Sequence, residues 1–360
     1  MMFAVAAVLL LFLVVVGLHE LGHALVARWF GVKIERIAIG FGNPILTIKD
    51  KRGIKWVVGI WPLGGYVQLL NTRIKEVHKG QYQHCFDKRP AAIRCLILLA
   101  GGFFNFLVAW FAICLVMMVG YSQYPAVVDK VFSHSLAAHA GLHEGDRLLA
   151  INAQKINSWQ EAGMQLITEL GHAKVKLQVI NAQQQSRALE INLSTQNFKS
   201  QKGTFFKRLG IKPKMNHSSL QWVAPQPFLN ALGHALCKVG SLGVFYSVMI
   251  KQLVTGQIPI SLLLGPFGLF TVSIDSFLEG FSTFMLFLAM LSVAVGIANY
   301  LPIPGLDGGS IFYILLEKIR GKPLSIAMEI LLYRFAMIVF FMFMARLILN
   351  DVGRYYYLTP

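Results

Sequence analysis

GLHELGHALVARW, residues 17–29, continues an uncharged apolar run that begins at residue 2, MFAVAAVLLLFLVVVGL. About 20 such residues are enough to cross the roughly 30 Å of a bilayer's hydrocarbon core, so a membrane span is predicted over about 2–26. An ionisable group at that depth costs roughly 2.5–3.5 kcal/mol on insertion scales. The grouping of His19, Glu20 and His23 within five residues therefore indicates a functional site.

Composition places the chain among membrane proteins. It has 360 residues, of which 55% are hydrophobic and 14% charged, and its mean hydropathy is +0.57. These values predict a polytopic membrane protein with a soluble part. The net charge of +16 fits the Lys and Arg that gather in cytoplasmic loops better than it fits nucleic-acid binding, so no nucleic-acid partner is expected. Four scattered cysteines without a CxxC pair predict neither a disulfide framework nor a cysteine zinc site.

Four spans are predicted, over about 2–26, 95–119, 281–301 and 331–349. The first is expected to stay uncleaved, because no basic segment precedes it and no small-residue cleavage site follows. The connections after the first and third spans are rich in Lys and Arg and are assigned to the cytoplasm, which leaves both termini outside. The sequence thus predicts a multi-pass protein of the inner (cytoplasmic) membrane.

Four regions are expected along the chain. Region 1–120 holds the first two spans and, within 38–70, a membrane-associated β-hairpin loop on the cytoplasmic side. Region 121–230 is expected to be an extracytoplasmic β-rich domain, with a helix over 159–170 and a hairpin from strands 174–179 and 187–193. Region 231–280 is expected to be a membrane-surface segment, in which the helix over 228–255 lies on the bilayer, with a fifth span as the alternative. Region 281–360 holds the last two spans.

The histidine spacing points to metal chemistry. Positions i and i+4 share one helix face, so His19 and His23 can bind a single zinc ion, and Glu20 is placed to act as general base on a water held there. A catalytic zinc needs a third protein ligand. Asp307 is the candidate, because NYLPIPGLDGG (299–309) breaks the helix of the third span at its cytoplasmic end. The predicted topology puts HELGH at the same depth.

These motifs resemble the site-2 protease family of intramembrane zinc metalloproteases, and its bacterial sigma-E-regulating members in particular. HELGH on the first span and LDGG after the third carry the resemblance. Supporting segments are AIGFG…PLGGYV, similar to the family's membrane re-entrant β-loop; GGFFNF (101–106), similar to G-P-x-x-N-F; AGLHEGDRLLAIN, similar to a PDZ strand and turn; and GPFGLF (265–270). Gly102 stands where the family has proline, and there is room for one PDZ-like domain where the best known members have two.

The resemblance implies an intramembrane zinc endopeptidase with one Zn²⁺ held by His19, His23 and Asp307 and with Glu20 as catalytic base. It also implies that Asn299 and the loop of Gly40 and Gly42 bind an unwound substrate, and the 54–60 run is expected to offer it a strand edge. The expected substrates are single-pass membrane proteins that have already been trimmed outside, such as an anti-sigma factor, or leftover signal peptides. A metal-binding membrane transporter and a non-proteolytic PDZ scaffold are the alternatives, and the PDZ-like domain is expected to act as a size filter or as a recruitment site.

Overall fold

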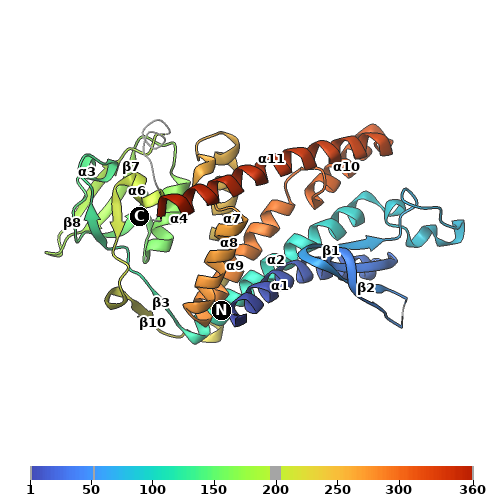
Figure 1. Cartoon of the computed structure of the whole chain (residues 1–360), viewed down its shortest axis with the longest axis horizontal. Helices are drawn as coiled ribbons and strands as arrows, with labels where there is room; N and C mark the ends of the chain where they lie inside the picture. Colours follow the sequence, from blue (N-terminus) through green and yellow to red (C-terminus); the bar gives the residue numbers. More distant parts are fainter. Residues whose placement is uncertain (1, 52, 195–203, 359–360) are drawn as a thin grey trace. The chain divides into compact units, whose positions relative to one another are not determined.

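The computed structural model describes residues 2–51, 53–194 and 204–358. The chain forms two compact units, each treated separately below (Figure 1). The first, which we name the membrane unit, comprises Met1–Leu115, Leu232–Val239 and Gly265–Pro360. The second, the β-rich unit, comprises Val116–Ala231 and Gly240–Leu264.

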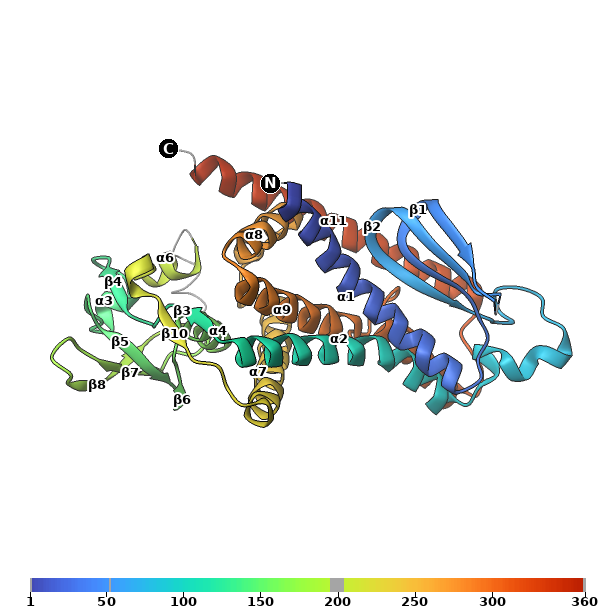
Figure 2. The same cartoon turned by 90° about the horizontal axis from the view of Figure 1, so that it is seen from below.

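Helices build the membrane unit. They are α1 (Met2–Trp29), most of α2 (Ala91–Val119), α8 (Pro266–Leu278), α9 (Phe281–Asn299), α10 (Asp307–Arg320) and α11 (Ile326–Leu358). Helix α1 contacts α8, α9 and a β-sheet, and both views show that sheet lying along α1 (Figures 1 and 2). The prolines at 302 and 304 follow the end of α9, because proline cannot continue a helix, and α10 starts afresh at Asp307.

The predicted hairpin over 38–70 is confirmed as β1 (Ile34–Lys49) paired antiparallel with β2 (Lys55–Leu69). Each strand bends back on itself, so that four segments lie side by side in the order 44–49, 55–59, 34–39 and 65–69. Gly40 and Gly42, both with φ near +86°, make the bend in β1. The 54–60 run thus becomes an inner segment of the sheet, and 65–69 is an edge.

The sheet is amphipathic, because directly opposite residues share a face. Ile48, Trp56, Ile37 and Val67 form one cross-strand row, and Lys49, Lys55 and Arg36 lie in a row on the other face. On the apolar face, segments 34–39 and 65–69 pack against the end of α1, where Ala24, Ala27 and Ile37 are buried together and Val67 packs against them. The same face of segments 44–49 and 55–59 is more exposed, with Ile48 54% and Trp56 39% exposed. This exposed apolar surface suits contact with membrane lipid.

A small β-sheet forms the core of the β-rich unit. Its four strands are antiparallel in the order β6 (Gln154–Lys155), β5 (Arg147–Ile151), β7 (Val175–Ile180) and β8 (Ser186–Ile191). The expected helix is α4 (Trp159–Thr168), capped by the Ser158 side chain. Shorter elements are β3 (Tyr121–Gln123), β4 (Val128–Val131), α3 (Leu136–His139), α6 (Phe205–Leu209), β9 (Ile211–Pro213) and β10 (Gln221–Val223). The expected helix, strands and hairpin are confirmed.

In the described ranges, six helices are long and apolar enough to cross a membrane. Four of them match the predicted spans, which confirms a polytopic helical membrane protein. The other two are α7 (Phe228–Val254) and the segment Ile260–Leu278 that contains α8. Length and composition select all six, so the number that cross stays a prediction.

Candidate active site

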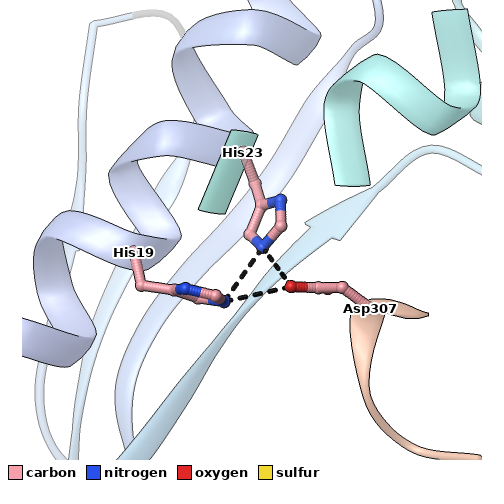
Figure 3. Close-up of side chains that lie close together, drawn as sticks. All are labelled: His19, His23 and Asp307. Carbon is pink, nitrogen blue, oxygen red and sulfur yellow. Dashed lines mark hydrogen bonds and ion pairs between the residues drawn. The ribbon is translucent and has the colours of Figure 1, made fainter. Parts of the chain in front are cut away.

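Three side chains from distant parts of the sequence converge at one point in the membrane unit (Figure 3). Helix α1 presents His19 and His23 one turn apart, and Asp307 is the first residue of α10. The two imidazole Nε2 atoms lie 3.2 Å apart. Each of them also lies 3.2 Å from Oδ2 of Asp307. The sequence prediction that these residues meet is therefore confirmed.

The convergence fits a zinc ion. Ligand atoms at the usual 2.0–2.1 Å from a tetrahedral zinc lie roughly 3.3 Å from one another, close to the separations seen here. Among the described residues, Oδ2 of Asp307 is buried without a hydrogen-bond partner of good geometry, although both Nε2 atoms are near. The three atoms thus point at a shared position between them, as ligands of one ion do.

The far side of each imidazole ring is also held. Nδ1 of His23 lies 2.8 Å from the carbonyl oxygen of Ile97. A carbonyl only accepts, so Nδ1 of His23 carries the proton and its Nε2 keeps a lone pair for a metal. Nδ1 of His19 lies 3.2 Å from the side-chain amide of Asn105. Both contacts come from α2.

Glu20 lies beside the same point, in a cavity of about 240 Å³ that is also lined by the three converging residues, the 65–69 edge and Asn299. Its side chain is buried, with 7% exposed. A Cβ added at Gly65 would lie 2.9 Å from Cγ of Glu20 and 2.8 Å from the carbonyl oxygen of Ala38. The edge segment therefore passes directly over Glu20, with no room for a side chain.

Two glycines of the GGFFNF motif allow α2 to approach the site. A Cβ at Gly101 would lie 2.6 Å from Cε1 of His23 and 2.7 Å from Cε1 of His19. A Cβ at Gly102 would lie 2.5 Å from the ring of Tyr300, whose hydroxyl donates to the carbonyl of Leu99. The space that any side chain at 102 would need is filled by Tyr300, which gives a steric reason for glycine at this position.

Gly101→Ala is expected to weaken zinc binding while the chain still folds. The added methyl group displaces both imidazole rings, and overpacking of this kind costs about 1–3 kcal/mol, or roughly 5–150-fold in affinity. Gly233→Ala on α7 is the matched control, because a Cβ there meets nothing within 4 Å. Competition with a chromophoric chelator measures both variants. Equal affinities for the two would contradict the steric role of Gly101.

Of the remaining predicted site residues, one lies at the cavity and two do not. Asn299 lines the cavity, and its amide donates to the carbonyl of Val295. Gly40 and Gly42 do not line it; they line a separate hollow on the polar face of the sheet, with Arg36 and Lys55. Sequence reasoning assigned no role to Asn105, although an amide inside an apolar span, which must find a partner, was the signal that could have found it.

A helical membrane protein with two histidines, an aspartate and a glutamate around one cavity has the features of an intramembrane metalloprotease. Comparison with known proteins agrees. The model of peptidase family M50 matches residues 7–344. The chain belongs to this family, and it is a zinc metalloprotease.

Relatives are similar over nearly their whole length. A protein of Rickettsia conorii, whose name assigns it provisionally to the zinc metalloproteases, is 30% identical over 94% of this chain and 95% of its own. The regulator of sigma-E protease of Escherichia coli K12 is 26% identical, covering 95% of this chain and 96% of its own. That of Haemophilus influenzae is 26% identical, covering 89% and 92%. The Escherichia coli alignment runs over 434 positions, more than the 360 residues here, so this relative contains insertions.

Proposed function

We propose that His19, His23 and Asp307 hold the catalytic zinc and that Glu20 is the general base. The observation that carries the proposal is the convergence of three ligand atoms, 3.2 Å apart, in a cavity that the buried Glu20 also lines. When bound there, zinc supplies Lewis acidity, which polarises a carbonyl group and makes water more acidic. Glu20 takes a proton from the attacking water and delivers it to the amide nitrogen as the peptide C–N bond breaks.

The 65–69 segment is proposed to hold the substrate. It pairs with 34–39 on one side only, and within the described residues no strand lies on its other side. It also lines the cavity with Glu20 and Asp307. A substrate helix must be unwound before hydrolysis, because its peptide groups are already hydrogen-bonded, and an unwound segment can pair with a free strand edge. This edge replaces the 54–60 run and the Gly40–Gly42 loop as the proposed point of contact.

Contacts within the β-rich unit support a surface position for α7. Just before α7, the backbone of Gln226 bonds to Met117 at the end of α2. At its other end, Gln252 donates to the carbonyls of Thr168 and Leu170, and Ile258 is part of the unit's core. Both ends of α7 therefore belong with the domain that follows α2. The segment Ile260–Leu278 is interrupted by extended backbone at Leu263 and Gly265. Its continuous helix, α8, has 13 residues and is about 20 Å long, too short for about 30 Å of hydrocarbon. Four crossings then leave His19 and Asp307 on the cytoplasmic side.

The proposed substrates are single-pass proteins of the inner membrane. The family assigns proteolysis, and the cavity lies in a helical membrane unit, so the substrate is a membrane protein. The names of the Escherichia coli and Haemophilus influenzae relatives connect them with sigma-E regulation. We therefore infer that an anti-sigma factor, already trimmed outside, is one substrate of this chain.

Metal removal tests the proposed function. The protein in lipid vesicles with a model transmembrane substrate is expected to contain one zinc per chain and to cleave within the membrane-spanning segment. Chelation should abolish cleavage, and stoichiometric zinc should restore it. Cleavage that persists in the fully metal-free protein would refute the zinc mechanism.

Cross-linking tests whether the 65–69 segment contacts the substrate. In a Glu20→Gln chain whose native cysteines are replaced, Tyr66→Cys is expected to form a disulfide with a cysteine near the scissile bond of the substrate. Tyr66 lies on the 65–69 segment and is 37% exposed. Ile48→Cys, 54% exposed on the opposite edge of the sheet, is the matched control and should give little product. Equal yields would contradict the assignment of the edge.

A further inference from the structure

Asn105 is a polar residue buried inside an apolar helix. It lies on α2, whose sequence AAIRCLILLAGGFFNFLVAWFAICLVMMV is otherwise nearly free of polar side chains, and it is fully buried. A buried amide without partners is destabilising, so its contacts need an explanation. The side-chain partner of Asn105 is Nδ1 of His19, at 3.2 Å.

The direction of this hydrogen bond decides whether His19 can bind a metal. With Nδ2 of Asn105 facing Nδ1 of His19, the imidazole has to accept, and its proton is left on Nε2, the atom that faces Asp307. A protonated Nε2 has no lone pair for zinc. In that orientation Oδ1 of Asn105 is also buried with no partner among the described residues. The oxygen and nitrogen of a side-chain amide are told apart only by their hydrogen bonds. If the Asn105 amide is turned by 180°, its oxygen faces Nδ1 of His19, and Nε2 can keep its lone pair.

We propose that Asn105 is a positioning residue, whose Oδ1 accepts the Nδ1–H of His19 and thereby fixes the Nε2 lone pair on the zinc position. The inference rests on the proposed metal site. It gives His19 the same arrangement as His23, whose Nδ1 donates to the carbonyl of Ile97 at 2.8 Å. Outer-shell acceptors of this kind orient metal-binding histidines and raise their basicity.

The spacing along α2 supports the proposal independently. Ile97, Gly101 and Asn105 are four residues apart, so they lie on one face of the helix. Ile97 holds Nδ1 of His23, Gly101 leaves room for both rings, and Asn105 holds Nδ1 of His19. One face of α2 is thus a continuous support for the two histidines, which assigns a role to the asparagine of GGFFNF.

The zinc affinities of two Asn105 variants distinguish a positioning role of this residue from a packing role. Asn105→Leu keeps the volume and removes the acceptor, and its zinc affinity is expected to fall about 10–100-fold. Asn105→Asp keeps an acceptor and is expected to stay within a few-fold of the unaltered chain. A packing role predicts the reverse order, because leucine fits an apolar helix and a buried carboxylate does not. Chelator competition on the full-length protein in detergent gives the affinities, and the thermal midpoints of the zinc-free forms report folding.

The outcomes are distinct. Unchanged affinity in Asn105→Leu, or an equal loss in both variants, overturns the positioning role. His19→Ala is measured alongside, and if it binds zinc as well as the unaltered chain, the proposed metal site itself is wrong. Should the leucine variant not fold, Asn105→Ala takes its place, because it removes the amide without adding volume.

Discussion

Replacing Glu20 by glutamine should abolish proteolysis and leave one zinc bound per chain. Glutamine has nearly the same shape as glutamate, but its neutral amide cannot take the proton of the attacking water. A positioned general base contributes about 10²–10⁴-fold to the rate, so cleavage should fall by at least that factor. The three atoms proposed to hold the metal come from other residues, and zinc content should not change.

Glu279→Gln is the matched control, because Glu279 is exposed at the end of α8 and should behave as the unaltered chain does. Cleavage of a transmembrane substrate and zinc content are measured on the same preparations. Normal cleavage by Glu20→Gln would show that another group acts as base. Loss of zinc together with activity would place Glu20 among the ligands.

Sequence was sufficient to bring the three converging residues together, because the placement of each rests on local rules. The helix period puts His19 and His23 on one face, and Pro302 and Pro304 end α9, so that Asp307 starts a new helix. Counting spans then brings the two motifs to the same depth. The structure adds the distances, and it places Asn299 beside them.

The surroundings of the site could not be predicted from sequence, because they depend on how the helices and strand segments pack against one another. That Ile97, Gly101 and Asn105 face the histidines follows from how α2 is rotated against α1, which helical periodicity does not fix. The 54–60 run reads as a strand in either position, but the bend at Gly40 and Gly42 makes it an inner segment and leaves 65–69 at the edge. Sequence could identify the strands and not their order.

Asp307→Ala should remove most of the zinc and all measurable proteolysis. Asp307 supplies one of three converging ligand atoms, and its carboxylate is the only anion among them. Its loss leaves two imidazoles from one helix, fewer than the three protein ligands that a catalytic zinc needs. The affinity should therefore fall by more than the roughly 10–100-fold expected for an outer-shell change. Glu20→Gln and Asp307→Ala should thus both be inactive, and only the second should be depleted of metal.

Asp275→Ala, on the exposed face of α8, controls for loss of an aspartate from the same unit. Zinc content after dialysis and chelator-competition affinity are compared for the two variants, with thermal unfolding of the zinc-free chains as the check on folding. If Asp307→Ala keeps one zinc per chain at unchanged affinity, a different residue completes the site. That result would leave His19 and His23 as ligands, because their spacing on α1 does not depend on α10. It would also mean that the buried Oδ2 of Asp307 lies 3.2 Å from two imidazole nitrogens without a metal to justify burying its charge.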